Sequence, residues 1–258
     1  MDEHPDEDDY LRIANLFYSA EQLAAPRYAM PYPNAEEAIR AGAVLAYVAR
    51  QVERFTRKGT RPRILEVGCG RGWLANLLSA FGPTVGIDPA EGPIAQAQSE
   101  FPHVTFRRCL LSDLMAEPGF APFDVVVSTE VLEHVPWAHK EGFVRELAAA
   151  VDDAGICVLT TPRGELFRLY RRHHANSLQP VEDWVTERQL RELAARCGLR
   201  VVDHTRVRPR RFGLLGRIAL SGKLRRSLER VGLRFLQSAF ENRFCHYQVV
   251  LLARNKRS

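Results

Sequence analysis

Residues 64–75 have the sequence ILEVGCGRGWLA, which is the most specific feature of the chain. A short apolar run leads into three glycines at alternate positions and then directly into residues with a helical pattern. Glycine permits a positive φ and lets a ligand approach the backbone without a Cβ in the way. Unpaired N–H groups at the start of a helix suit a carboxylate or a phosphate. The stretch therefore predicts a ligand-binding turn between a buried strand and a helix.

The rest of the chain alternates short apolar runs with amphipathic stretches, which is typical of a parallel sheet flanked by helices. Strands are expected at residues 63–67, 84–87, 104–107, 123–128, 155–160, 199–207 and 245–253. Helices are expected at residues 10–25, 34–57, 72–81, 91–101, 130–134, 139–151 and 186–197. Asn34 is expected to cap the second of these helices, and Gly198 to end the last one.

The spacing of the glycines separates two classes of nucleotide-binding site. Dinucleotide enzymes use G-x-G-x-x-G, whereas Gly68, Gly70 and Gly72 give G-x-G-x-G with Glu66 two residues ahead. A carboxylate in that place would repel a pyrophosphate and attract a cation such as the sulfonium nucleoside S-adenosylmethionine (SAM). Asp88 ends the next predicted strand, where an acid can accept hydrogen bonds from both ribose hydroxyls. The alternatives are a purely structural glycine turn and an Asp88 that only caps a helix.

These segments, together with FDVVVSTEVLEHVP at residues 123–136, resemble class I SAM-dependent methyltransferases over about residues 60–205 and the last strand. The resemblance implies an α/β fold: a Rossmann-like, seven-stranded, mostly parallel sheet with an antiparallel last strand, flanked by helices. It implies cofactor contacts from Glu66, Gly68, Cys69, Gly70, Gly72, Asp88, Pro89, Thr129 and Glu130. Where the family often has an acid that binds adenine, this chain offers Leu111, Ser112 and Asp113.

Glu130, Glu133 and His134 have spacings that an α-helix would place on one face. Two carboxylates and an imidazole can hold a divalent ion, and oxygen ligands suit Mg²⁺ or Mn²⁺. The Glu-x-x-Glu-His spacing is similar to that of ubiquinone-biosynthesis O-methyltransferases, where it implies a metal near a catechol-like substrate. Without a metal, His134 is the candidate general base, with Glu133 as the second catalytic candidate. A structural role is the remaining alternative.

The domain organisation is expected to have three parts. Residues 1–9 form an acidic disordered tail, residues 10–60 a helical cap or lid, and residues 61–258 the SAM-binding domain. Within that domain, 163–185 and 206–240 are expected as substrate-side or surface insertions. The stretch 206–234 holds nine Arg and one Lys against a single acid, Glu229. Basic amphipathic helices favour anionic membrane surfaces, and a helix packed on the sheet or a homodimer contact are the alternatives.

Composition limits the remaining classes. The chain has 258 residues, of which 46% are hydrophobic and 26% charged, as in an ordinary soluble protein. No apolar run approaches the ~18 residues that span a bilayer, and the acidic first ten residues do not resemble a targeting peptide, so a cytoplasmic location is expected. Five scattered cysteines without a CxxC pair support neither a zinc site nor a disulfide framework.

The leading functional hypothesis is methyl transfer from SAM to a hydroxyl, or an amine, of a small-molecule acceptor by in-line displacement. Nucleic acid is a less favoured partner because the formal net charge is only +5. The chain also lacks an Asn/Asp-Pro-Pro-aromatic motif and a Pro-Cys nucleophile. Two alternatives stay open: nucleic-acid methylation, and a SAM-binding regulatory protein without turnover.

Overall fold

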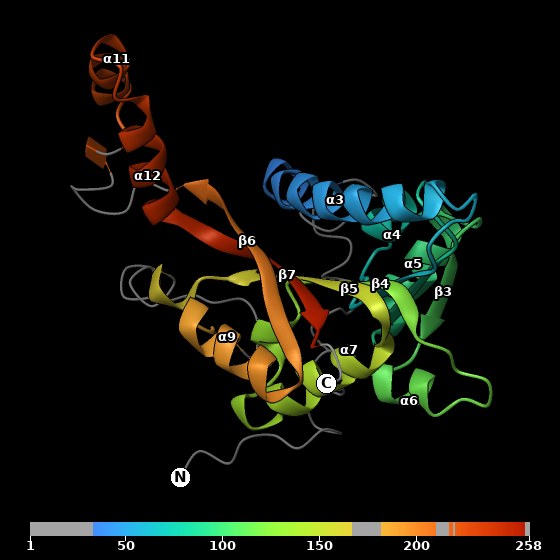
Figure 1. Cartoon of the computed structure of the whole chain (residues 1–258). Helices are drawn as coiled ribbons and strands as arrows, with labels where there is room; N and C mark the ends of the chain where they lie inside the picture. The colour runs from blue at the N-terminus through green and yellow to red at the C-terminus, as the bar shows by residue number, and fades with distance from the viewer. Residues whose placement is uncertain (1–32, 167–181, 210–216, 219, 256–258) are drawn as a thin grey trace.

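Seven strands form one sheet in the computed structural model, which describes residues 33–166, 182–209, 217–218 and 220–255. The strands are β1 (Ile64–Val67), β2 (Thr84–Asp88), β3 (Thr105–Arg108), β4 (Phe123–Thr129), β5 (Val151–Pro162), β6 (Leu199–Pro209) and β7 (Cys245–Arg254). Their order is β3-β2-β1-β4-β5-β7-β6 (Figure 1). Strands β1 to β5 pair in parallel, and β7 runs antiparallel to both β5 and β6. The expected Rossmann-like sheet with an antiparallel last strand is confirmed.

The strand order reverses between β1 and β4. From β1 the chain continues outward through β2 and β3 and then returns to β4 on the other side of β1. In open α/β sheets, ligands bind outside the carboxyl ends of the strands at such a reversal. The glycine turn follows β1 and residues 129–134 follow β4, so the topology brings the two predicted motifs to the same place.

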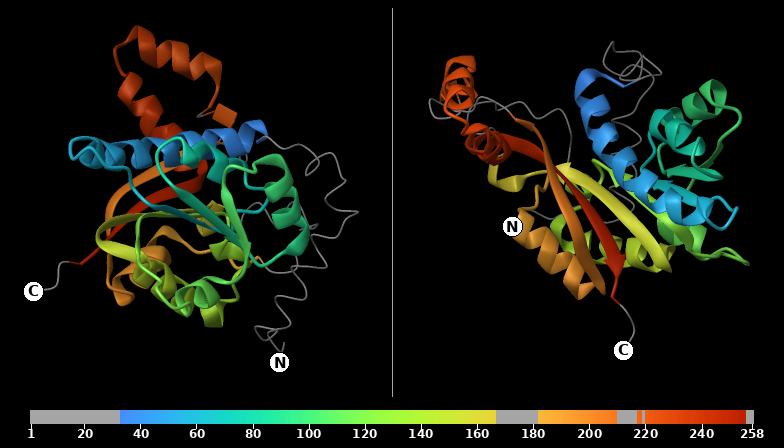
Figure 2. Two further views of the ribbon diagram at one scale, coloured as in Figure 1. Left: turned by 90° about the vertical axis from the view of Figure 1, so that its right-hand side faces the viewer. Right: turned by 45° about the horizontal axis from the view of Figure 1, so that its top comes forward.

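Helices cover both faces of the sheet (Figures 1 and 2). On one face, α3 (Ala35–Thr56) and α4 (Trp73–Ser79) pack with Val125 and Val127 of β4. On the other face, α6 (Leu111–Met115), α7 (Lys140–Ala150) and α9 (Glu187–Arg196) pack with Val126. The change of face between neighbouring valines follows from the two-residue period of a strand. Helix α5 (Glu91–Glu100) packs in a third cluster around Phe106.

The expected ends of two helices are confirmed in detail. The Asn34 side chain accepts hydrogen bonds from the N–H groups of Glu36 and Glu37, and the Glu37 carboxylate accepts one from the Asn34 N–H. Gly198 follows the last turn of α9 with φ +75°. Of the expected cap or lid at 10–60, the structure describes α3, whose buried side chains pack against one face of the sheet.

Residues 217–244 form a feature that we call the arm. It contains α11 (Gly222–Arg230) and α12 (Arg234–Phe244) and projects from the body beyond β6 and β7 (Figures 1 and 2). The insertion was expected at 206–240, but residues 206–209 belong to β6. The described part of that insertion begins at residue 217, with the arm.

Several expectations fall outside the described residues. These are the tail at 1–9, the cap or lid up to residue 32 with its helix at 10–25, residues 167–181 of the 163–185 insertion, and residues 210–216 and 219 of the 206–240 insertion. Within the part of the chain that is described, no helix has the length and apolar composition that crossing a membrane requires. All five cysteines are free thiols.

Candidate active site

Glu66 lies in the third position of β1 and is almost fully buried, at 2% exposure. Its carboxylate accepts a hydrogen bond from the backbone of Ala75 in α4, but Oε2 has no partner. Burial raises the pKa of Glu66 well above its usual value, and the nearby Asp88 carboxylate raises it further. A buried carboxyl oxygen without a partner is costly, so this position is suited to a bound cation or donor.

The three glycines after β1 differ in what a side chain would meet at each position. A Cβ on Gly68 would lie 2.2 Å from Val131 Cγ2, and one on Gly72 would lie 2.5 Å from the Phe106 ring. A Cβ on Gly70 would meet nothing within 4 Å, although its φ of +50° also favours glycine. Gly68 and Gly72 are therefore required by packing, whereas Gly70 leaves open space above the backbone.

Asp88 at the end of β2 is half-buried and holds the glycine turn. Its Oδ2 accepts a hydrogen bond from the Gly70 N–H at 3.0 Å, and Oδ1 accepts one from the Ala90 N–H at 2.9 Å. Burial raises the pKa of Asp88, and the two backbone donors counteract this shift. The ribose candidate and the glycine turn are thus in direct contact. Cys69, by contrast, points its side chain into the small core around Phe106.

The adenine candidates occupy the start of α6 after β3. The Leu111 side chain is buried in the main core, so its backbone alone remains for a ligand. Ser112 is exposed. Asp113 is exposed and accepts a hydrogen bond from the Leu110 N–H, which caps the helix.

The expected helix at 130–134 is wrong. Strand β4 ends at Thr129, Glu130 takes a left-handed φ of +57°, and a 3₁₀ turn, η1, covers only Leu132–His134. The Glu130 N–H donates to the carbonyl oxygen of Thr160 in β5, which continues the sheet ladder in place of a helix. Glu130, Glu133 and His134 therefore do not share the face of one helix.

The two acidic side chains are committed to separate partners. Glu130 Oε1 accepts a hydrogen bond from Thr160 Oγ1 at 2.7 Å and lies 3.7 Å from Arg40 Nε. Glu133 Oε2 accepts a hydrogen bond from Thr161 Oγ1 at 3.0 Å, and its Oε1 lies 3.9 Å from His134 Nε2. Burial raises the pKa of each carboxyl to about 7.

This arrangement does not fit a divalent metal ion. Among the residues that the structure describes, no three His, Cys, Asp or Glu side chains converge as metal ligands. Glu130 and Glu133 instead bind neighbouring threonines, and Arg40 brings a positive charge to the same place. The expected Mg²⁺ site at Glu130, Glu133 and His134 is therefore not supported.

We expect Mg²⁺ or Mn²⁺ to leave the melting temperature of the protein unchanged, measured against NaCl of equal ionic strength. A site filled at about 100 times its Kd would stabilise the fold by about 2.7 kcal/mol. That would raise the melting temperature by roughly 5–10 °C. If Mg²⁺ or Mn²⁺ raises the melting temperature by this amount, and Glu130→Gln abolishes the rise, the expected metal site is present after all.

Two further cations lie at the site and were not expected from the sequence. Arg40 comes from α3, with its guanidinium 4.3 Å from the centroid of the Tyr247 ring and with Nη1 buried and unpartnered. Lys140 begins α7 and is fully buried; its Nζ donates to the carbonyl oxygens of Leu132, the first residue of η1, and Val135, which follows η1. Neither residue belongs to a motif, because each is brought to the site by tertiary packing.

Known proteins resemble this chain in sequence over about two fifths of its length. A probable SAM-dependent methyltransferase of Mycobacterium tuberculosis is 32% identical over 111 residues, 43% of this chain and 39% of that protein. A ubiquinone biosynthesis O-methyltransferase of Azorhizobium caulinodans is 39% identical over 103 residues, 38% of this chain and 40% of that protein. The match thus spans about two fifths of the length of these curated relatives.

A solved structure and a family match extend the likeness to most of the chain. The magnesium protoporphyrin IX methyltransferase of Synechocystis, solved with bound SAH, covers 96% of this chain and is itself covered completely, with a TM-score of 0.61. At 17% identity this likeness concerns the fold alone. Residues 39–204, more than half of the chain, match the family described as methyltransferase domain. The chain belongs to the methyltransferase domain family.

Proposed function

We propose that this protein is an enzyme that transfers a methyl group from SAM to a hydroxyl of a small-molecule acceptor. The observation that carries the proposal is Glu66, whose buried Oε2 lacks a partner beside a turn that Gly70 leaves open. Membership of the methyltransferase domain family supports it, as do the O-methyltransferases among the relatives. An amine is the alternative acceptor group.

In this proposal the cationic end of SAM lies near Glu66. Burial raises the pKa of this carboxyl, and a bound cation would lower the pKa again and so favour the ionised carboxylate. Asp88 binds the ribose hydroxyls with the acceptor capacity that its two backbone hydrogen bonds leave free. Gly70 leaves the space in which the nucleoside approaches the turn, Gly68 and Gly72 let the turn pack against Val131 and Phe106, and Pro89 follows Asp88 beside it. Thr129 and Glu130 border the methionine end. Backbone groups from Cys109 to Leu111 face the adenine.

The bound sulfonium supplies a methyl group that is already activated, so the chain has mainly to orient the acceptor and exclude water. His134 takes the proton of the acceptor hydroxyl as the oxygen attacks the methyl carbon and the carbon–sulfur bond breaks. Glu133, 3.9 Å away, stabilises the imidazolium that forms. The products are the methylated acceptor and S-adenosylhomocysteine, and the proton leaves to solvent.

The proposal is tested by calorimetric titration with SAM, followed by a labelled-methyl assay on pools of small molecules, lipids and RNA. We expect micromolar SAM binding and label in a hydroxyl-bearing small molecule, with His134→Ala reducing turnover by about 100-fold. Label in RNA alone would overturn the acceptor class. SAM binding without transfer to any pool would favour a regulatory protein, and no SAM binding would remove the proposal.

We expect Gly70→Ala to weaken SAM binding by about tenfold, because its Cβ would project into the space proposed for the nucleoside. Gly59→Ala is the matched control: Gly59 also has positive φ, +68°, and open space around its Cβ position, but it lies in the turn after α3. Both variants should lose about 1 kcal/mol of stability from backbone strain. Equal SAM affinity in the two variants would place the nucleoside elsewhere.

A further inference from the structure

We propose that the arm, residues 217–244, docks the protein on an anionic lipid surface. The arm carries seven Lys and Arg residues against Glu229 and Glu241, a net charge of +5. This equals the formal net charge of the whole chain, so all other residues together are neutral. The net positive charge of the protein thus equals that of one projecting element, where it can attract an anionic surface.

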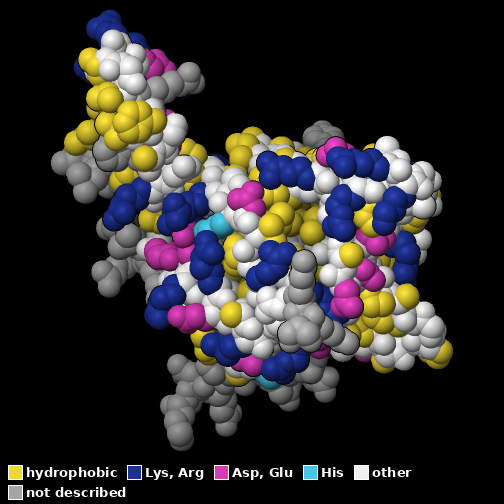
Figure 3. Space-filling view, viewed as in Figure 1, with side chains coloured by type: hydrophobic (Ala, Val, Ile, Leu, Met, Phe, Trp, Pro, Cys, Tyr) yellow, Lys and Arg dark blue, Asp and Glu magenta, His cyan; other side chains and the backbone are white. Residues whose placement is uncertain are grey.

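Large apolar side chains are exposed on the same element. Ile218, Val231, Leu233 and Phe235 are between 37% and 65% exposed, and three of them lie at the corner between α11 and α12. They make up half of the large exposed hydrophobic residues in the described part of the chain. Apolar side chains gather on the near face of the arm, with Lys and Arg at its tip (Figure 3).

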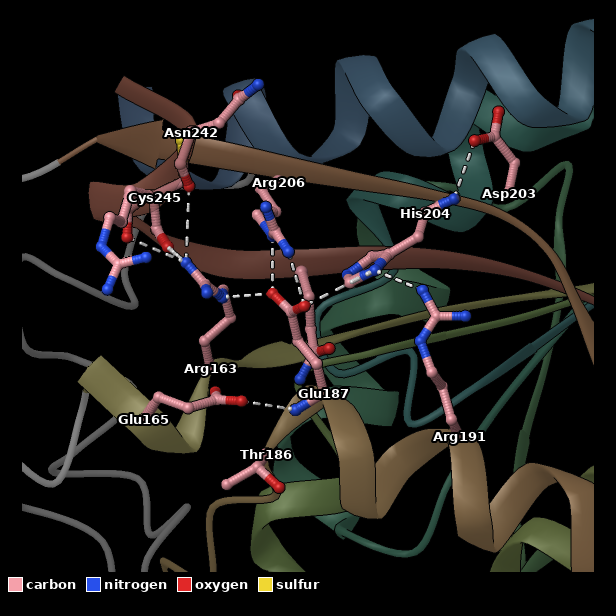
Figure 4. A network of polar contacts seen from close by, with 12 residues as sticks. Arg163, Glu165, Thr186, Glu187, Arg191, Asp203, His204, Arg206, Asn242 and Cys245 are labelled. Atoms are coloured by element: carbon pink, nitrogen blue, oxygen red, sulfur yellow. Dashed lines mark hydrogen bonds and ion pairs between the residues drawn. The ribbon is translucent and has the colours of Figure 1, made fainter. Parts of the chain in front are cut away.

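The base of the arm is fixed to the sheet by an ionic network (Figure 4). Arg163, at the end of β5, donates from Nη1 to the carbonyl oxygens of Arg243 and Cys245 at 3.3 and 2.7 Å. Its Nε lies 2.6 Å from the Glu187 carboxylate, which also accepts two hydrogen bonds from Arg206 of β6. The base of the arm is thus bound by Arg163, which Glu187 of α9 holds in place together with Arg206 of β6.

The arm leaves the sheet at the edge that carries the proposed site. Tyr247, just beyond the arm, pairs with Pro162 at the carboxyl end of β5, and its ring contacts Arg40. A lipid surface bound by the arm would therefore lie beyond the same edge of the sheet at which Glu130 and His134 are placed.

Among the partners that a basic surface can meet, an anionic bilayer uses both kinds of side chain on the arm. Lys and Arg meet the head groups while Val231, Leu233 and Phe235 enter the boundary with the acyl chains. A nucleic-acid backbone would use the cations and leave the apolar corner in water. Two copies of the arm would repel each other because both carry the same charge.

The test is sedimentation of the full chain with vesicles of phosphatidylcholine, alone or mixed with phosphatidylglycerol. We expect binding to the mixed vesicles alone, reversed by high salt. Val231→Ser/Leu233→Ser/Phe235→Ser and, separately, Arg226→Glu/Arg230→Glu should each weaken this binding by about tenfold or more. The matched control, Leu77→Ser/Val202→Ser, removes two exposed apolar residues from the body and should bind as the unmodified chain does.

Unchanged melting temperature and SAM affinity in the arm variants would show that they fold, and these readouts are independent of lipid. Equal binding to both kinds of vesicle would overturn the proposal, as would retained binding in both arm variants or an equal loss in the control. If the unmodified chain binds no vesicles but forms a dimer, and the apolar variant is a monomer, the arm binds a second copy of the chain instead. Retention of RNA without vesicle binding would assign it to nucleic acid. Because lipid docking needs no turnover, its failure would leave the proposed methyl transfer untouched.

Discussion

Asp88→Asn is expected to weaken SAM binding by about 100-fold, whereas the fold should lose only about 1 kcal/mol of stability. The amide has one acceptor oxygen where the carboxylate has two, and it carries no charge to strengthen hydrogen bonds from two ribose hydroxyls. Hydrogen bonds to a charged group are worth about 1.5–3 kcal/mol each, so a net loss of about 3 kcal/mol is reasonable. That loss corresponds to about 100-fold in Kd. Isothermal titration calorimetry measures it directly.

The matched control is Asp124→Asn. The Asp124 carboxylate also accepts a backbone hydrogen bond, from the Arg63 N–H at 2.7 Å, but it lies at the amino end of β4, away from the proposed site. Each substitution should lower the melting temperature by a few degrees for the loss of about 1 kcal/mol in backbone capping. The control should bind SAM as the unmodified chain does. If both variants bind SAM normally, Asp88 only holds the glycine turn through Gly70 and Ala90.

The sheet was predictable from the sequence because its strands are short apolar runs between clear turn signals. Every expected strand is present, and the ends differ mainly in β5, which begins at Val151 rather than at residue 155. The glycine turn was also predictable, because three glycines at alternate positions indicate backbone conformations that other residues rarely adopt. All three have a positive φ in the structure. The sequence did not reveal that Gly68 and Gly72 serve packing, because Val131 and Phe106 reach them only in the folded chain.

The error at residues 130–134 has a physical cause. The pattern of Glu130, Glu133 and His134 has helical spacing, but Glu130 takes a left-handed φ of +57° and its N–H continues the pairing of β4 with β5 through Thr160. A right-handed helix cannot include a residue in that conformation, so the three side chains do not share a helical face, on which the expected metal site depended. The five-residue helix α6 was missed because so short a segment has no period to detect.

Lys140 shows most clearly what tertiary packing adds. In the sequence it is one charged residue near the start of a helix, where solvent exposure is the usual expectation. In the fold it is completely buried, and burial lowers its pKa to about 8, against the usual value of 10.5. The Asp183 and Glu133 carboxylates counteract that shift. Its two carbonyl partners, Leu132 and Val135, lie on either side of Glu133 and His134 in the chain, so we propose that Lys140 positions both residues.

The lowered pKa of Lys140 makes stability depend on pH with a definite sign. Between about pH 8 and 10.5 the folded protein releases a proton that the unfolded chain still holds, so the free energy of unfolding rises with pH. This contribution is fully present above pH 10.5 and is lost as the pH falls through 8. Its full size is about 3 kcal/mol. Urea unfolding between pH 7.5 and 10 should reveal part of that rise, and Lys140→Met should remove it.

Lys140→Met should also reduce kcat by about 100-fold while SAM affinity stays within about threefold. Without Nζ, the carbonyl oxygens of Leu132 and Val135 lose their donor, the turn relaxes, and His134 moves relative to the acceptor. A displacement of about 1 Å at a reacting group costs about 100-fold in rate. Lys58→Met, at an exposed lysine after α3, is the control and should change neither kcat nor the pH dependence of unfolding. If Lys140→Met keeps the full kcat but loses the rise of the free energy of unfolding with pH, Lys140 contributes to stability and not to catalysis. Only a positioning role links the buried ammonium to the rate of methyl transfer.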